Sequence, residues 1–319
     1  MDKKILVTGI SGFAGNYLAR KLLDRGYNKI YGTYLSEKSI GSLFGISSQL
    51  ELFQLDLMDS KTVYEVINKI KPDYVYHLAA IASSVQSFKE PNFVITNNIN
   101  SQINLLEAIR NTKLNPRIMI VSSAEVYGKV DPKDLPIDED TPLKPVNPYA
   151  VSKLTQDFLG LQYFIAYNID IIRVRPFNHI GPGQTEQFST SAFAKKIVEI
   201  EKEKKEPVLT VGNLEAKRDF TDVRDMVWAY ILLMEKGKSG DVYNIGSGKA
   251  YKMSEVLDMM LSFSKVKIKV ETDSSLLRPS DNPELVCDNT KIQNLTGWIP
   301  EIPLEQTLKD ILEYWREKA

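Results

Sequence analysis

The sequence predicts an α/β fold in which a doubly wound parallel sheet carries helices on both faces. Three observations lead to this prediction: short apolar, β-branched runs recur along the chain, segments with helical spacing separate them, and a glycine-rich turn follows the first run. Strands that alternate with helices build a parallel sheet, because each helix carries the chain back to the edge where the next strand begins. With 319 residues, 43% of them hydrophobic and 25% charged, the chain is long enough for one large domain or two interleaved ones.

The predicted strands are rich in β-branched and other apolar residues, and they are Lys4–Val7, Lys29–Tyr34, Leu50–Leu55, Tyr74–Leu78, Ile118–Val121, Ile169–Val174 and Val242–Ile245. The first helix is predicted at Asn16–Arg25, where Leu18, Leu22 and Leu23 lie on one side and Gly26 can end the helix. The first strand, this helix and the next strand form one βαβ unit.

A second helix is predicted from Asn147 to about Ala166, because a capping residue is followed by Pro148 at the first helical position. This helix carries Tyr149 and Lys153.

Beyond Phe177 the regular alternation weakens. Gly181-Pro182-Gly183 interrupts the chain, a charged helix is predicted at Ser191–Lys205, and Pro207 ends it. We interpret this part as the start of a smaller region that covers the substrate, with a return to the main sheet near Val223–Ile245.

Composition and charge argue against several classes of protein. Lys and Arg number 40 against 41 Asp and Glu, and this net charge of -1 does not suit a binder of nucleic-acid backbones. The single cysteine, Cys287, cannot form an intramolecular disulfide, and with only His77 and His179 the chain lacks a Cys/His cluster for zinc. The N-terminus does not resemble a signal peptide, and the longest apolar run, Val227–Met234, is too short to span a bilayer. We expect a soluble cytoplasmic protein with no metal, membrane or nucleic-acid partner.

The glycine-rich turn lies between the first strand and the first helix, which is the context of a dinucleotide-binding fingerprint. Gly9, Gly12 and Gly15 would permit the tight turn, the close approach of a pyrophosphate and the packing of the helix, whose N-terminal N–H groups favour an anion. A tight turn without a ligand is the alternative. The expected contacts around the pyrophosphate are Gly9, Ser11, Gly12, Phe13, Ala14 and Gly15. The fold class is therefore Rossmann-type, and the cofactor is NADP(H) or NAD(H).

The ribose end of the cofactor site leaves two alternatives open. Glu37 at the end of the second strand would favour the 2′-hydroxyl of NAD, whereas Ser36 and Lys38 could hold the 2′-phosphate of NADP. Asp56-Leu57 is placed for the adenine, and Ala79-Ala80 ends a strand with small residues that let a cofactor lie close. Both segments could instead be strand-end packing.

A catalytic set is predicted from two segments. Tyr149 and Lys153 are four residues apart on one helix, so their side chains share a face, and the ammonium can lower the pKa of the phenol towards neutrality. Ser122 and Ser123 follow the fifth predicted strand, at the sheet edge where open α/β folds bind ligands. Glu125 lies two residues further on.

The sequence resembles the extended short-chain dehydrogenase/reductase family at the glycine turn, Ser123, Tyr149 and Lys153, and the likeness covers essentially the whole chain. The longer strings that carry it are Arg173-Val-Arg-Pro-Phe-Asn178, Arg218-Asp-Phe-Thr-Asp-Val and Gly297-Trp298. Within that family, Phe177-Asn-His-Ile-Gly-Pro-Gly-Gln184, Val211-Gly-Asn-Leu-Glu-Ala-Lys-Arg218-Asp-Phe and Leu277-Arg-Pro-Ser-Asp281 are most similar to GDP-6-deoxy-D-mannose reductases.

The resemblance implies NAD(P)H-dependent reduction of the 4-keto group of a GDP-linked 4-keto-6-deoxy sugar, giving GDP-D-rhamnose. Tyr149 would give the proton, Ser123 would hydrogen-bond the carbonyl oxygen, and Lys153 would bind the nicotinamide ribose. The residues implied for the cofactor also include Leu78, Asn98, Ser122, Tyr149 and Lys153. Those implied for the substrate are Ser123, Glu125, Asn178, Val211, Arg218 and Arg278. Arginine suits a diphosphate because it binds phosphate in a two-pronged way; otherwise Arg218 pairs with Asp219 or Asp222.

The resemblance also implies two interleaved domains and a homodimer. Residues 1–176, with about 221–247 and 286–297, would bind the NAD(P) cofactor. The smaller domain, at about 177–220, 248–285 and 298–319, would bind the substrate. The helices around Asn98–Ile109 and Tyr149 would form the dimer interface, for which Phe158, Leu159, Leu161 and Phe164 are suited, although these could also face the sheet.

Three alternatives remain open. A sugar 4,6-dehydratase would use Glu125 to remove the C5 proton, and Ala124 in place of an aspartate does not exclude the GDP-mannose dehydratases. A fucose-forming epimerase-reductase would need a cysteine and histidine pair, for which Cys287 is poorly placed. An NAD(P)-binding regulatory protein without turnover is the alternative of a different class.

Overall fold

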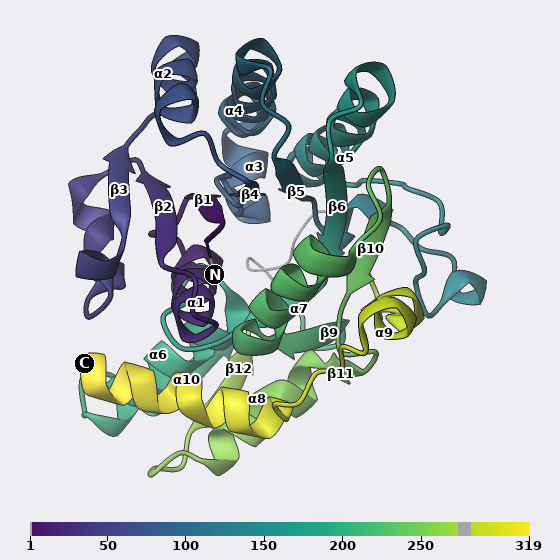
Figure 1. The fold of residues 1–319 in the computed structure, drawn as a ribbon. Helices are drawn as coiled ribbons and strands as arrows, with labels where there is room; N and C mark the ends of the chain where they lie inside the picture. Colours follow the sequence, from purple (N-terminus) through teal and green to yellow (C-terminus); the bar gives the residue numbers. More distant parts are fainter. Residues whose placement is uncertain (1, 274–281) are drawn as a thin grey trace.

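A seven-stranded parallel sheet forms the centre of the larger part of the molecule in the computed structural model, which describes residues 2–273 and 282–319 (Figure 1). The strand order is β10-β6-β5-β4-β1-β2-β3. The strands are β1 (Lys4–Thr8), β2 (Lys29–Tyr34), β3 (Glu51–Gln54), β4 (Tyr74–His77), β5 (Arg117–Val121), β6 (Ile171–Pro176) and β10 (Val242–Ile245). The predicted doubly wound α/β fold is confirmed, and all seven predicted strands lie in this one sheet.

The order of the strands reverses between β1 and β4. The chain runs outward from β1 through β2 to β3, and then returns to place β4 on the other side of β1. Loops that leave β1 and β4 at their carboxyl ends therefore diverge, and open α/β sheets bind ligands in the crevice that this divergence creates.

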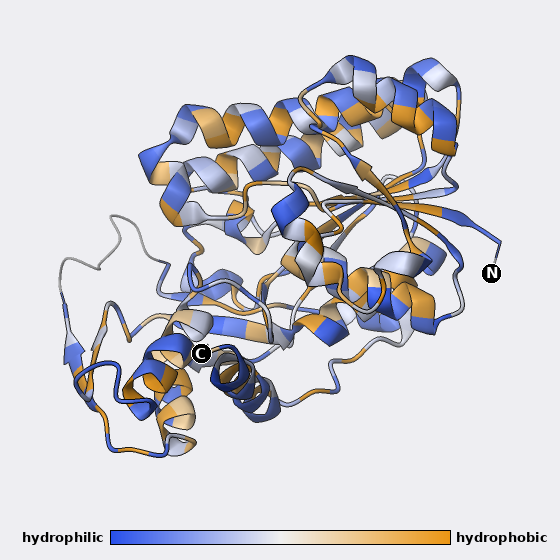
Figure 2. Ribbon diagram, turned by 90° about the vertical axis from the view of Figure 1, so that its left-hand side faces the viewer, coloured by the Kyte–Doolittle hydropathy of each residue, from blue (hydrophilic) through white to orange (hydrophobic). Residues whose placement is uncertain are grey.

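Helices cover both faces of the sheet, as Figure 1 shows. One face carries α2 (Ser60–Ile70), α3 (Ser84–Lys89), α4 (Pro91–Thr112) and α5 (Pro148–Tyr167), and the other carries α1 (Phe13–Asp24), α7 (Val223–Lys236) and α9 (Thr290–Thr296). Hydrophobic and hydrophilic residues alternate along these helices in Figure 2, as expected for helices with one buried side. Short 3-10 helices lie at η1 (Glu37–Leu43), η2 (Ser47–Gln49), η3 (Ala124–Tyr127) and η4 (Pro132–Asp134).

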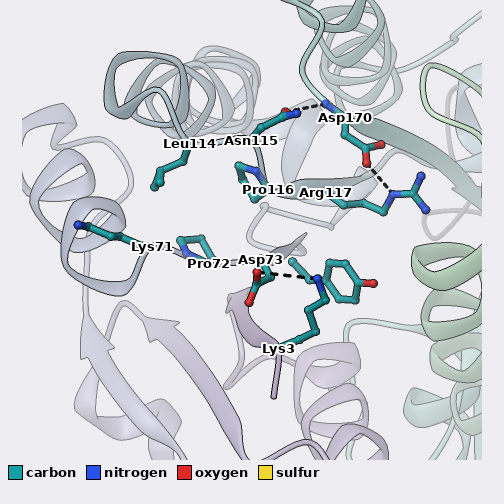
Figure 3. A pocket seen from close by; sticks show the side chains of 10 residues that line it. Lys3, Lys71, Pro72, Asp73, Leu114, Asn115, Pro116, Arg117 and Asp170 are labelled. Atoms are coloured by element: carbon teal, nitrogen blue, oxygen red, sulfur yellow. Dashed lines mark hydrogen bonds and ion pairs between the residues drawn. The ribbon is translucent and has the colours of Figure 1, made fainter. Parts of the chain in front are cut away.

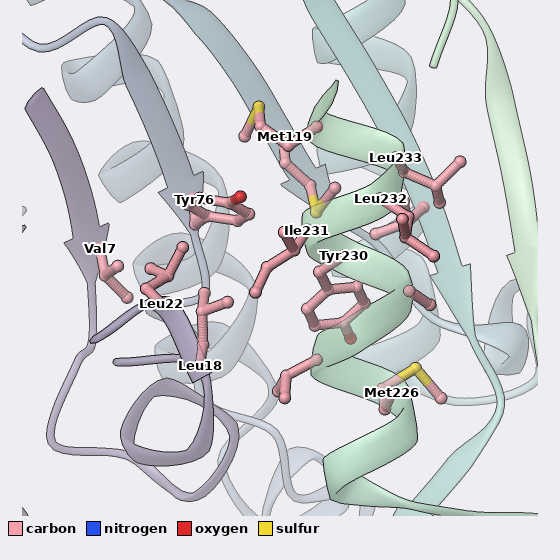
Figure 4. Close-up of a cluster of buried hydrophobic side chains, with 14 of the residues drawn as sticks. Val7, Leu18, Leu22, Tyr76, Met119, Met226, Tyr230, Ile231, Leu232 and Leu233 are labelled. Atoms are coloured by element: carbon pink, nitrogen blue, oxygen red, sulfur yellow. The ribbon is translucent and has the colours of Figure 1, made fainter. Parts of the chain in front are cut away.

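The core on the α1 and α7 side is drawn in Figure 4. Leu18 and Leu22 of α1 meet Tyr76 of β4, and Tyr230 and Ile231 of α7 complete the cluster. The apolar run predicted not to span a membrane is thus the buried centre of α7. No helix among the described residues has the length and apolar character needed to cross a bilayer.

Helix α1 begins at Phe13, three residues before the predicted start. The difference has a physical reason: the chain turns into the helix directly after Gly12, which is the N-cap. Gly26 follows the helix with a φ of 82°, in the left-handed conformation expected of a residue that ends a helix.

A second hydrophobic core lies beside the large sheet and is built from the C-terminal half of the chain. Its helices are α6 (Ser189–Glu201), α8 (Met253–Ser262) and α10 (Leu304–Lys318). Its strands are β7 (Asn178–Ile180), β8 (Val208–Val211), β9 (Lys217–Asp222), β11 (Ala250–Lys252), β12 (Lys269–Thr272) and β13 (Glu284–Leu285). Strand β9 pairs with β7, β11 and β13, so it joins segments from three parts of the sequence.

The charged helix predicted to reach Lys205 ends at Glu201. Glu203 has a φ of 57°, which a continuing right-handed helix cannot accommodate. The predicted helix was too long because the alternation of charged residues continues into the turn, whereas the buried residues of α6 end at Ile200.

Candidate active site

The predicted site residues gather at the carboxyl edge of the sheet because all its strands are parallel. Gly9 follows β1, Leu78 follows β4, Ser122 follows β5, and β7, which begins at Asn178, follows β6. The residues that follow these strands are therefore close together, although the strands are far apart in the sequence.

The glycine turn has the shape that a pyrophosphate requires. Gly9 has a φ of 69°, and a Cβ on it would lie 3.0 Å from the Cα of Ala79. A Cβ on Gly15 would lie 2.3 Å from the carbonyl oxygen of Gly9, so only glycine lets α1 approach the turn this closely. Because the N-cap Gly12 has no side chain, the first N–H groups of α1 stay available for an anion. These residues fit the pyrophosphate of a dinucleotide.

At the predicted ribose end of the site, the carboxylate of Glu37 is bound by a neighbouring side chain. The Tyr34 hydroxyl donates to Oε1 of Glu37 at 2.9 Å, which draws this carboxylate back along β2. Ser36 and Lys38 are exposed beside it. Ser11 of the glycine turn donates to the Ser39 hydroxyl at 2.9 Å and ties the turn to η1.

The two residues expected near the adenine behave differently from each other. Asp56 is exposed, and its Oδ1 accepts from the backbone of Met58 at 2.9 Å. The side chain of Leu57 is buried in the core between the sheet and α2 and α4, so it lies in strand-end packing.

Asn98 is fully buried on α4 and acts through its side-chain amide on the loop after β4. Its Oδ1 accepts from the backbone of Ile81 at 2.8 Å, and its Nδ2 donates to the Ile81 carbonyl at 3.1 Å and to the Ser152 hydroxyl at 3.0 Å. Ser122 is likewise buried, and its hydroxyl donates to the Lys153 carbonyl at 3.1 Å. Asn98 therefore ties α4 to α5 and to the loop after β4, and Ser122 ties the end of β5 to α5.

Ser123, Tyr149 and Glu125 lie together. The Tyr149 and Ser123 hydroxyls are hydrogen-bonded, and the Ser123 hydroxyl also accepts from the backbone of Glu125 at 3.2 Å. Asn147 caps α5 by accepting from Ala150 at 2.8 Å and donates to Oε2 of Glu125 at 3.0 Å. One capping residue therefore sets both the start of α5 and the position of the Glu125 carboxylate.

The expectation that the pKa of Tyr149 falls towards neutrality is wrong for the protein alone. Burial raises the pKa of Tyr149 to about 12, although the hydrogen bond from Ser123 opposes the rise and the charge of Glu125 adds to it. Burial also lowers the pKa of Lys153 to about 7, so this lysine carries only part of its charge at neutral pH. Desolvation of both groups outweighs the attraction that the spacing alone suggests.

Lys153 is 5% exposed, and its ammonium donates to Oε1 of Gln156 at 2.7 Å. Next to it, His77 of β4 has its Nδ1 2.9 Å from the Thr8 hydroxyl, and burial lowers the pKa of this histidine to about 3. The imidazole is therefore neutral at physiological pH.

Sequence reasoning missed a buried charge cluster beneath α5. Asp157 is 0% exposed and accepts from Arg173 at 2.6 Å and from Arg175 at 2.8 Å. Arg175 also donates to the Tyr127 hydroxyl at 2.9 Å, and that hydroxyl donates to Asn244 at 2.7 Å. The sequence held one signal: the two arginines are two residues apart on a strand, so they face the same side, and that side meets α5.

The residues expected to bind the substrate lie in different parts of the fold. Asn178 lies on β7, opposite Phe220 of β9. The side chain of Val211 is buried in the second core. Arg278 lies outside the described residues.

Arg218 lies on β9 and donates to the carbonyl oxygens of Lys217 at 2.8 Å and Asn282 at 2.7 Å. The two aspartates offered as its partners bind other groups. Asp219 accepts four hydrogen bonds from Ser247, Gly248 and Cys287, and Asp222 accepts from Arg224 and Thr307.

A cavity of about 410 Å³ lies at the opposite, amino edge of the sheet (Figure 3). Four of its five charged side chains form ion pairs: Arg117 with Asp170 at 2.9 Å, and Lys3 with Asp73 at 3.9 Å. Because β1, β4, β5 and β6 begin there rather than end, none of the predicted catalytic residues reaches it.

The fold and the site together define an extended short-chain dehydrogenase/reductase. The sequence model described as GDP-mannose 4,6 dehydratase matches residues 6–311, and the chain belongs to that family.

Among its relatives, a GDP-6-deoxy-D-mannose reductase of Pseudomonas aeruginosa is 30% identical over all of this chain and 99% of the relative. A GDP-mannose 4,6-dehydratase of Vibrio cholerae is 28% identical over all of this chain and 95% of that protein. The structure of RMD from Pseudomonas aeruginosa complexed with NADPH, 30% identical, has a TM-score of 0.87 and covers 99% of this chain and 100% of that chain.

Proposed function

We propose that the protein reduces the 4-keto group of GDP-4-keto-6-deoxy-D-mannose to GDP-D-rhamnose with a reduced nicotinamide dinucleotide. The observation that carries the proposal is the hydrogen-bonded pair of Tyr149 and Ser123 at the carboxyl edge of the sheet. Support also comes from the reductase relative that matches over the full length and from the relative solved with NADPH.

The cofactor supplies a hydride to the carbonyl carbon when it is bound. The residues that would hold it are the glycine turn at its pyrophosphate, Ser36 and Lys38 at its adenosine ribose, and Lys153 at its nicotinamide ribose. NADPH is the preferred form in this proposal, because Glu37 is engaged by Tyr34 and leaves Lys38 to meet a 2′-phosphate.

Tyr149 serves as the proton donor. Because burial raises the pKa of Tyr149 to about 12, the phenol is protonated at neutral pH and ready to give its proton to the carbonyl oxygen. Ser123 donates to the same oxygen as negative charge develops on it, and afterwards to the phenolate that Tyr149 becomes. The positive charge of Lys153 favours that phenolate.

The second core would bind the GDP end of the substrate. Asn178, Arg218 and Arg278 belong to this half of the chain in our proposal, with Arg218 gripping the diphosphate. Strand β9 supports this role because it pairs with β7, which places Arg218 and Asn178 on neighbouring strands.

The proposal is tested by supplying NADPH with either GDP-4-keto-6-deoxy-D-mannose or GDP-mannose and following cofactor absorbance. Oxidation with the keto sugar alone is expected. Tyr149→Phe should abolish it, while Tyr167→Phe, an exposed tyrosine at the far end of α5, should not. Conversion of GDP-mannose without net cofactor oxidation would instead identify a dehydratase.

The second candidate, a GDP-mannose 4,6-dehydratase, is favoured by one observation. Asn147 holds the Glu125 carboxylate near Tyr149, where a base for the C5 proton would lie. Glu125→Gln separates the two functions: a reductase keeps most of its kcat, whereas a dehydratase loses its turnover because the proton acceptor is gone.

We also propose that the protein is a homodimer that works in the cytoplasm. Phe93 of α4 is 55% exposed, and Phe158 and Ile165 of α5 are 48% and 71% exposed, which gives these helices an apolar outer surface. Leu159 and Phe164 instead pack against the sheet. Phe158→Glu should yield monomers by light scattering; an unchanged mass would argue against this interface.

A further inference from the structure

The amide of Gln156 lies between the ammonium of Lys153 and the backbone of α4. Its Oε1 accepts from Nζ of Lys153 at 2.7 Å, and its Nε2 donates to the carbonyl oxygen of Asn98 at 2.7 Å. Gln156 is 1% exposed, so water does not compete for either contact. The amide therefore links the ammonium of Lys153 to the backbone of α4.

The orientation of this amide is fixed by chemistry. The Asn98 carbonyl can only accept a hydrogen bond, so the NH2 end of Gln156 must face it and the oxygen must face Lys153. The backbones are held as well, because Gln102 of α4 donates to the Gln156 carbonyl at 2.7 Å and Ser122 donates to the Lys153 carbonyl at 3.1 Å. The acceptor for Lys153 is thus held by contacts on both of its sides.

We propose that Gln156 is a positioning residue: it takes one of the three N–H donors of Lys153, sustains the ammonium form, and leaves the other two donors for the nicotinamide ribose. This inference rests on the proposed role of Lys153 at that ribose. An ammonium has three donors in tetrahedral directions, so anchoring one of them restricts the other two.

Several groups around Lys153 influence whether this lysine carries a charge. Asp157 on the same helix is paired with Arg173 and Arg175 of β6, and its charge also raises the pKa of Lys153 against the effect of burial. The other titratable group whose charge interacts with that of Lys153 is His77 of β4, which is neutral because burial lowers its pKa to about 3. Burial lowers the pKa of Lys153 to about 7. The Gln156 oxygen is the neutral acceptor of the hydrogen bond from this buried ammonium.

The test measures NADPH affinity of the substrate-free protein by fluorescence titration between about pH 6 and about pH 9, the range over which Lys153 loses its charge. In Gln156→Leu the loss of affinity should begin on the order of one pH unit lower than in the wild type, with about tenfold weaker binding at neutral pH. In Gln156→Glu it should begin at higher pH, because a carboxylate favours the ammonium.

Gln102→Leu is the matched control, because this buried glutamine also bridges α4 and α5 but does not touch the ammonium. Its pH profile should follow the wild type. A profile of Gln156→Leu that matches the control would overturn the inference, and if that variant does not fold, an unshifted Gln156→Glu profile would do so. Failure of the wild type to bind NADPH at any pH would instead contradict the proposed function, and the inference with it.

Discussion

Replacing Lys153 by methionine should stabilise the protein near neutral pH. The folded protein holds this lysine with a pKa of about 7 against 10.5 for an unburied lysine. The unfolded chain therefore binds more protons between these two values, and the stability of the wild type rises as the pH is raised through this window. Methionine has a similar volume and does not titrate, so the variant lacks this dependence.

The size of the effect follows from the shift of Lys153. A difference of roughly 3.5 pH units corresponds to roughly 5 kcal/mol below pH 7, where both states are protonated, and to only about 1 kcal/mol near pH 9.5. The advantage of Lys153→Met over the wild type should therefore shrink by roughly 3 kcal/mol or more across this range. The variant also loses the hydrogen bond to Gln156, which offsets part of its gain in the free energy of unfolding. This loss does not depend on pH in the same way.

Urea unfolding followed by tryptophan fluorescence at several pH values measures this difference. Lys133→Met is the control, because the Lys133 side chain is 76% exposed and its replacement should give a free-energy difference that stays nearly constant with pH. A Lys153→Met difference that is equally flat would refute the reasoning, since it would mean that Lys153 is not held in an environment that disfavours its charge.

Three further changes have expected outcomes. Asp157→Asn leaves two buried arginines without their carboxylate and should lower the free energy of unfolding by about 3–5 kcal/mol, against less than about 1 kcal/mol for Glu51→Gln at an exposed ion pair, both measured by urea unfolding. Gly15→Ala places a methyl group against backbone atoms of the glycine turn and should weaken NADPH binding at least about tenfold by fluorescence titration; wild-type affinity would count against the proposed cradle. Lys38→Ala should raise the KM for NADPH about tenfold and leave that for NADH unchanged in steady-state assays, whereas equal effects on both would remove its role at the 2′-phosphate.

The large sheet was predictable because strands buried on both faces appear in the sequence as continuous apolar runs. A strand covered by helices on both sides must be apolar along its length, as Ile5 to Val7 and Ile118 to Ile120 are, and such runs are visible without a structure. The glycine turn was predictable for a related reason: Gly15 allows no Cβ, so the constraint is local.

The electrostatics of the site were not predictable in the same way. The spacing of Tyr149 and Lys153 correctly indicates a shared helix face, but it says nothing about desolvation. Desolvation raises the pKa of Tyr149, against the expected fall, and lowers the pKa of Lys153. Gln156 looks in the sequence like an ordinary polar helix residue. Its role depends on the Asn98 carbonyl, which a separate helix brings into contact.

Tyr149, Lys153 and Asp157 are spaced by four residues, so they follow one face of α5 from its N-terminus inward. The first meets Ser123, the second meets Gln156, and the third is anchored to β6 by two charged hydrogen bonds. Because all three share one face, the ion pairs of Asp157 fix the rotation of the helix and hence the direction of the phenol. Strand β6 also leads directly to Asn178, so the same two arginines set the position of the phenol relative to the start of the proposed substrate-binding half. Stability and catalysis therefore depend on the same contact between α5 and β6.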